Sequence, residues 1–146
     1  MPSAFAILGL LICAASIGYA DVLVGAPLDQ NAGDPEFMDQ AWMAVTKVNE
    51  ESNEGGYYMV PTKVLSAKTQ VVAGIIYTSS VLFEESSCKK ADVSVAELRA
   101  ANCEPMKDGK RAIYEVSVFE QPWLNSEQVN VKELRVLAHG EQHVAI

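Results

Sequence analysis

The sequence predicts an α+β fold in which one long helix precedes a set of antiparallel strands. Apolar residues first recur at intervals of three and four over residues 37–48, which is the spacing of one helical face. After two glycines at 55–56, β-branched and aromatic residues dominate four runs that are separated by turn-forming residues. A helix with one apolar face, followed by strands, indicates a sheet packed against that helix.

The helix is expected to begin at Asp34. An aspartate can cap the first turn, Pro35 suits the first helical position, and Glu36 favours the positive end of the helix dipole. The apolar face consists of Phe37, Ala41, Val45 and Val48. The two glycines at 55–56 end the helix, so we expect one continuous helix over residues 37–52.

Four strands are expected after the helix, over residues 57–68, 75–83, 111–120 and 128–137. Pro61 places the first strand at a sheet edge or at a bulge, because proline cannot donate to the ladder. Residues 84–109 are expected to form a polar excursion, in which Ser94 and Glu97 have capping-box spacing and predict a helical turn over 95–101. A change of alternation near Lys132 and Glu133 predicts a bulge in the last strand.

Residues 1–20 have the pattern of a secretory signal peptide. An apolar run over residues 5–15 precedes Gly18 and Ala20, at the positions that a signal peptidase reads. We expect secretion to the extracellular space and a single domain over residues 21–146, and a buried N-terminal helix is the alternative. The formal net charge of −8 argues against nucleic-acid and anionic-membrane partners.

Cysteine and histidine usage gives little sign of catalysis. Cys13 lies in the leader, and in an oxidising compartment the remaining pair, Cys88 and Cys103, most simply forms one disulfide. A catalytic thiol would need a histidine in a structured position, whereas His139 and His143 both lie in the C-terminal tail. These two histidines have helical spacing but no convincing further ligands. We expect no enzyme activity, no metal site and no cofactor.

Three short apolar features stand in the segments that join or precede the strands. They are Leu23-Val24-Gly25 near the mature N-terminus, Gln70-Val71-Val72-Ala73-Gly74 between two strands, and Pro122-Trp123 in a later turn. Each has a structural alternative, namely an opening strand, a buried hairpin and a tryptophan packed in the core. Apolar residues on exposed turns make sense where a partner covers them, and we expect Trp123 to be exposed.

The order of these features resembles the cystatins, which are secreted inhibitors of papain-like cysteine proteases. The matching residues are Gly25, then Gln70-x-Val72-x-Gly74, then Pro122-Trp123. The predicted order of one helix ahead of four strands also matches the family, and the resemblance covers residues 22–137. It implies a five-stranded antiparallel sheet wrapped around the long helix.

The resemblance also implies a mode of action, which is reversible, tight-binding inhibition of cathepsin-type proteases (L, B or S) without cleavage. Leu23 and Val24 would lie in the non-primed subsites of the protease, and Gly25 would let the arm bend. Residues 70–74 would sit over the catalytic centre, and Trp123 would cover the primed side. Together the three features would form a wedge that fills the active-site cleft.

A second inhibitory site is implied by Ser52-Asn53-Glu54. Some secreted cystatins carry a Ser-Asn-Asp loop after the helix, whose asparagine is read by the asparaginyl endopeptidase legumain. Here Glu54 replaces the aspartate. An asparagine followed by an acid is also an ordinary way to end a helix, so both interpretations stay open.

The chain departs from the family in its disulfides. Secreted cystatins usually have a second disulfide that bridges the last two strands, and this chain has no cysteine in either strand. Without that disulfide, the hairpin formed by the last two strands would be less constrained, which would favour a domain-swapped dimer in addition to the monomer.

The alternative function is that of a binding or signalling module with the cystatin fold and no inhibitory activity, because fold does not fix function. The three intact motifs favour inhibition.

Overall fold

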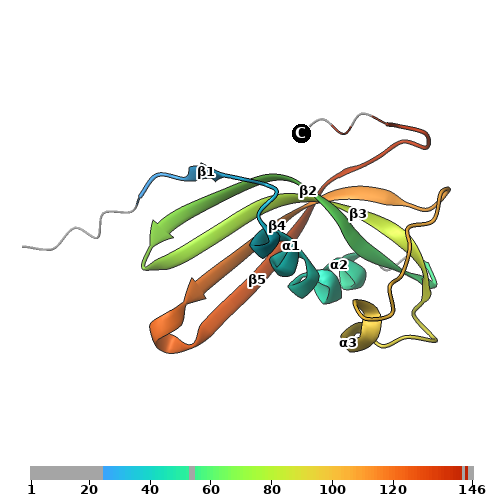
Figure 1. The fold of residues 1–146 in the computed structure, drawn as a ribbon, viewed down its shortest axis with the longest axis horizontal. Helices are drawn as coiled ribbons and strands as arrows, with labels where there is room; N and C mark the ends of the chain where they lie inside the picture. The colour runs from blue at the N-terminus through green and yellow to red at the C-terminus, as the bar shows by residue number, and fades with distance from the viewer. Residues whose placement is uncertain (1–24, 53–54, 143, 145–146) are drawn as a thin grey trace, which may run out of the picture.

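The computed structural model describes residues 25–52, 55–142 and 144 (Figure 1). It confirms the α+β fold and the five-stranded antiparallel sheet, whose strands lie side by side in chain order. The strands are β1 (Leu28–Gln30), β2 (Tyr57–Val72), β3 (Gly74–Lys89), β4 (Arg111–Gln121) and β5 (Ser126–Val136). The helices are α1 (Pro35–Met43), α2 (Val45–Glu51), the short α3 (Val95–Leu98) and the 3₁₀ turn η1 (Pro122–Leu124).

The expected single long helix is wrong in one respect, because it is divided into α1 and α2 at Ala44. The backbone N–H of Ala44 is shared between the carbonyls of Gln40 and Ala41, at 3.2 Å each, so one turn is wound more tightly than an α-helix. The predicted start is confirmed, since the Asp34 carboxylate accepts a hydrogen bond from the Glu36 N–H at 3.1 Å.

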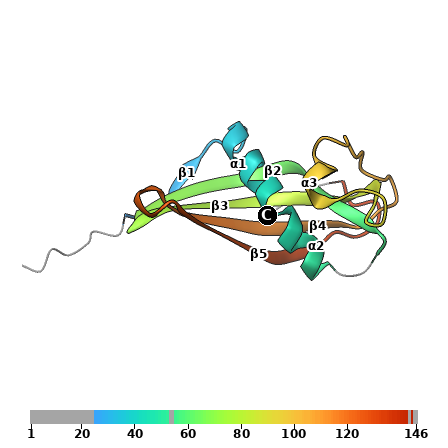
Figure 2. The same ribbon diagram turned by 90° about the horizontal axis from the view of Figure 1, so that it is seen from below.

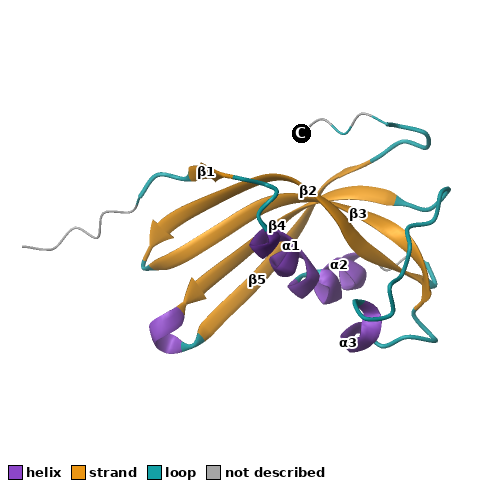
Figure 3. Ribbon diagram, in the orientation of Figure 1, coloured by secondary structure: helices purple, strands orange, loops and turns teal. Residues whose placement is uncertain are grey.

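The core lies between this helical pair and one face of the sheet, as Figure 2 and Figure 3 show. The predicted apolar face of the helix is buried there against residues of β2, β3 and β4. Phe83 and Tyr114 meet edge to face in this core, with ring centroids 5.5 Å apart. A smaller cluster consists of Leu82 and Ile113, which alternate along their strands with residues of the main core, and of Leu137, which directly follows β5.

Asn49 fastens the helical pair to the sheet. Its buried side-chain amide donates to the carbonyls of Val45 and Met59, both at 2.9 Å, and its oxygen accepts from the Met59 N–H at 2.8 Å. β1 pairs only with residues 67–69 of β2, so β1 does not reach Met59. The asparagine thus supplies to the edge of β2 the two hydrogen bonds that a neighbouring strand would make.

Two strand predictions need correction. β3 does not end at Phe83 but continues to Lys89, because the returning chain gives it new partners: Glu85 N–H donates to the Lys110 carbonyl at 2.8 Å, and Ser87 N–H to the Glu104 carbonyl at 2.9 Å. β2 likewise continues past the predicted end at residue 68, to Val72. The predicted bulge near Lys132 and Glu133 is confirmed, since the register of β5 shifts at Leu134. The register of β2 does shift next to Pro61, as its proline predicts.

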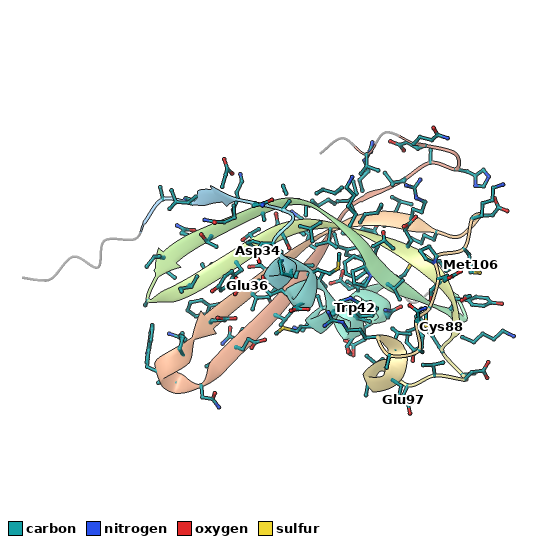
Figure 4. The ribbon with its side chains drawn as sticks, viewed as in Figure 1. Asp34, Glu36, Trp42, Cys88, Glu97 and Met106 are labelled. Carbon is teal, nitrogen blue, oxygen red and sulfur yellow. A yellow bond between two sulfur atoms is a disulfide. The ribbon has the colours of Figure 1, made fainter. Side chains whose placement is uncertain are left out.

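The excursion after β3 is held by a disulfide and by side-chain contacts to α1. Cys88 and Cys103 are bonded, with their Cα atoms 5.5 Å apart. Ser94 donates its hydroxyl hydrogen to the Glu97 carboxylate at 2.7 Å, next to α3. The Arg99 guanidinium carbon lies 5.6 Å from the centre of the Trp42 ring, and Trp42 is labelled in Figure 4. None of the helices in the described residues is long and apolar enough to cross a membrane.

We predict that Asn49→Ala lowers the free energy of unfolding by about 3 kcal/mol, because it leaves both backbone groups of Met59 buried without a partner. Chemical denaturation measures this loss. Asn130→Ala is the matched control, since Asn130 is exposed on β5, and it should change the free energy by less than about 0.5 kcal/mol. Equal stabilities of the two variants would contradict the role given to Asn49.

Candidate functional site at one end of the sheet

The three sequence features meet at one end of the sheet, which we call the site end and define as Gly25, residues 70–74 and residues 121–125. In Figure 1 the β2–β3 tip, the β4–β5 tip and the chain leading into β1 all lie at this end. The antiparallel order of the sheet causes this, because β3 pairs with both β2 and β4 and brings alternate turns to the same end.

The first tip is the turn between β2 and β3. Val72 pairs with Gly74, so Ala73 alone forms the tip. Gly74 has φ +146°, and a Cβ atom there would lie 2.5 Å from the Glu120 carbonyl oxygen and 2.6 Å from the Phe119 ring. Only glycine fits this backbone and this close approach of β4. Val71 is 60 % exposed, so the tip does present apolar surface.

The arm is fastened to the first tip at Gly25. The Gly25 N–H donates to the Val71 carbonyl, and the Gln70 side-chain amide donates to the Gly25 carbonyl, both at 2.9 Å. An added Cβ atom at Gly25 would lie 3.3 Å from the Val71 carbonyl oxygen. The alternative to a free arm was an opening strand, and the first strand of the sheet, β1, begins only at Leu28. Leu23 and Val24 lie outside the described residues.

The second tip is the turn between β4 and β5. Pro122 begins the 3₁₀ turn η1, and Asn125 closes it in the left-handed conformation (φ 47°), donating its N–H to the Pro122 carbonyl at 3.1 Å. This rigid turn leaves Trp123 66 % exposed and Leu124 62 % exposed. The predicted exposure of Trp123 is therefore confirmed.

The Gln121 side chain joins the two tips. Its amide donates to the Ala73 carbonyl at 2.9 Å. Sequence reasoning missed both Gln121 and Leu124 as site residues. The only available signal for Leu124 was its place beside Trp123 on a turn, and a lone glutamine gives no signal before the strand register is known.

Three glutamates border the site end on the helix side. Glu120 and Glu127 are directly opposed across β4 and β5, and Glu36 lies at the start of α1, where Figure 4 labels it. Burial, followed by the charges of Glu127 and Glu36, raises the pKa of Glu120 above its ordinary value of 4.5. A raised carboxyl pKa favours folding at low pH, and this contribution is lost as the pH rises through the raised pKa. The site end is thus bordered by three carboxyl groups, two of which act on the pKa of the third.

The remaining predicted residues lie elsewhere. Ser52 is buried just after α2, and Asn53 and Glu54 lie outside the described residues. His139 lies 3.7 Å from the Asp108 carboxylate, and nothing is described for His143. Within residues 25–52, 55–142 and 144, no three His, Cys, Asp or Glu side chains gather as a metal site would require.

Comparison with known proteins gives a consistent family. Residues 25–123 match the model of the cystatin domain. The chain is similar to cystatin cpi-1 of Caenorhabditis elegans, at 38 % identity over 94 % of this chain and 98 % of that protein. It is also similar to the crystal structure of Al-CPI, with a TM-score of 0.66 and 33 % identity over 77 % of this chain and all of that one. Dimeric human cystatin F shares the fold, with a TM-score of 0.64 at 21 % identity over 90 % of this chain and 99 % of that one.

We predict that Gly74→Ala destabilises the protein by about 2 kcal/mol or more, because a side chain at a positive φ would also collide with β4. Thermal unfolding measures the change. Gly56→Ala is the control, since no atom lies within 4 Å of a Cβ placed there. A Gly74→Ala protein as stable as the control would show that the close approach of β4 is not required.

Proposed function

The chain belongs to the cystatin family of cysteine protease inhibitors, and from this premise we propose that its site end is a wedge that fills the active-site cleft of papain-like proteases. Members of this family inhibit proteases and are not enzymes. The proposal rests on one observation: the arm at Gly25, the first tip and the second tip lie side by side at the site end. Hydrogen bonds of 2.9 Å connect each segment to the next, from Gly25 to Val71 and from Gln121 to Ala73.

Each segment of the wedge has its own task in this proposal. The first tip, with Val71, enters the cleft above the catalytic thiol, and Trp123 with Leu124 covers the primed side. Leu23 and Val24 continue from Gly25 into the non-primed subsites. The first tip is a tight turn with a single residue outside the ladder, so it offers the thiol no extended peptide to cleave, and inhibition is reversible.

Tight binding follows from two properties of the wedge. Its apolar side chains become buried in the protease, and its three segments lose little conformational freedom when they bind. Exposed Val71, Trp123 and Leu124 supply the apolar surface. The three hydrogen bonds between the segments already hold them in place in the free protein, so the entropic cost of binding is small. Cathepsins of the L, B and S types, which share the papain-like cleft, are the proposed targets.

We predict that the protein secreted from a eukaryotic host inhibits papain and a cathepsin L-type protease reversibly, and that Trp123→Ala weakens inhibition by about 30-fold or more, equivalent to about 2 kcal/mol. Gly25→Arg should also weaken it, because a side chain at this position crowds the Val71 carbonyl. Inhibition constants from titration of active protease measure both effects.

Val136→Ala is the control for these variants, because Val136 is also an exposed apolar residue but lies at the last position of β5, away from the site end. It should inhibit like the parent. A folded, disulfide-bonded parent that inhibits neither protease would contradict the proposal. It would favour the alternative, a non-inhibitory cystatin-fold binding or signalling module.

A second proposed site comprises Ser52, Asn53 and Glu54 and would act on legumain. Its support is the sequence match and the fact that Ser52 follows α2, a helix that lies apart from the three wedge segments (Figure 1). We predict that Asn53→Ala abolishes inhibition of legumain and leaves inhibition of papain unchanged, whereas Trp123→Ala weakens inhibition of papain and leaves inhibition of legumain unchanged. Parallel titrations against the two proteases test this, and loss of both activities in Asn53→Ala would contradict two independent sites.

Secretion and assembly complete the proposal. Residues 1–20 act as a signal peptide and residues 21–146 form the secreted domain, so sequencing of the secreted protein should begin at Asp21. The protein is a monomer that can exchange its first hairpin with a second copy, since no disulfide fixes the β4–β5 hairpin among the described residues. Sedimentation after mild heating should detect such a dimer, and an exclusively monomeric protein would contradict exchange.

A further inference from the structure

We propose that Gln121 is a positioning residue of the wedge, which holds the first tip in register with the turn that carries Trp123. The proposal rests on the proposed inhibitory function for its biological meaning. Its structural part concerns the free protein alone, so the two can be tested separately.

The strand register places Gln121 where the backbone ladder between β3 and β4 ends. Ile75 and Glu120 form the last pair of that ladder, and Ala73 belongs to neither strand. The Gln121 side-chain amide donates to the Ala73 carbonyl at 2.9 Å, one step beyond the last pair. The side chain therefore continues the ladder past the point at which the two backbones separate.

The close packing at Gly74 makes this bond short and direct. A Cβ atom on Gly74 would lie 3.1 Å from Cγ of Gln121, so the glutamine side chain runs alongside the glycine. Gln121 is half-buried there. With no side chain on Gly74 in the way, the amide reaches the Ala73 carbonyl across the first tip.

Gln121 also belongs to the second tip. Its backbone pairs with Ser126 at the start of β5, so it closes the loop that contains Trp123. Among the described residues, no other side-chain hydrogen bond connects the two tips. On the opposite side of the first tip, Gln70 makes the equivalent bond to Gly25. Two glutamine amides thus link three segments that are distant in the chain.

The consequence is that Gln121 contributes to inhibition without needing to touch the protease. Without the Gln121 amide, the strands that lead to the two tips are joined by hydrogen bonds only as far as the Ile75–Glu120 pair. The tip then samples more orientations, and binding must restrict them at an entropic cost. A lost hydrogen bond of ordinary strength corresponds to about a three- to tenfold weaker inhibition.

The test replaces Gln121 by methionine, which keeps the length of the side chain and removes the amide. Residues 1–146 are expressed in a secretory host. Gln128→Met is the control, because Gln128 is an exposed glutamine on the adjacent strand with no side-chain hydrogen bond among those of the described residues. Two quantities are measured: the inhibition constant for papain, and the NMR order parameters of backbone amides 72–74 in the free protein.

We expect Gln121→Met to inhibit papain about three- to tenfold less tightly than Gln128→Met, with lower order parameters at residues 72–74 and an unfolding temperature that falls by no more than a few degrees. Gln121→Ala serves as a second variant and should give the same pattern. Order parameters equal to those of the control would overturn the proposal. If the parent protein failed to inhibit papain, the order parameters would still decide whether Gln121 positions the tip.

Discussion

The arrangement of the site end depends on the absence of a side chain at residue 74. Gly74 turns the chain at φ +146° and lets the first tip lie directly against the end of β4, where a Cβ atom would be 2.5 Å from the Glu120 carbonyl. This contact places the Gln121 amide within reach of Ala73 and sets the first tip beside the Trp123 turn. A bulkier residue would force the two tips apart, and with them the apolar surface that they present.

The rest of the fold supplies a rigid base for this contact. β3 runs without interruption from Gly74 to Lys89 and is paired with β2 on one side and, over residues 75–84, with β4 on the other. The tips therefore extend from the most strongly paired part of the sheet. Asn49 secures the helices to β2 through backbone groups that no strand satisfies. A wedge built this way needs little ordering when it binds, which is the physical reason that a few exposed residues can act as an effective inhibitor.

Features that depend on local chemistry could be predicted from the sequence. The cap at Asp34, the turn at Gly74 and the exposure of Trp123 each follow from a few neighbouring residues. The break at Ala44 comes from a shared hydrogen bond that the apolar spacing does not encode. The extension of β3 beyond Phe83 depends on partners from residues 104–110, and the role of Gln121 depends on strand register, so neither could be inferred before the chain was folded.

The central claim, that three segments form one protease-binding wedge, is tested most directly by NMR of the isotope-labelled protein with inactivated papain. The account predicts that backbone shifts on binding concentrate at residues 25, 70–74 and 121–125, in a single saturable transition. It predicts no comparable shifts at residues 107–111, at the opposite end of β4. Shifts confined to one segment, or concentrated away from the site end, would contradict the account.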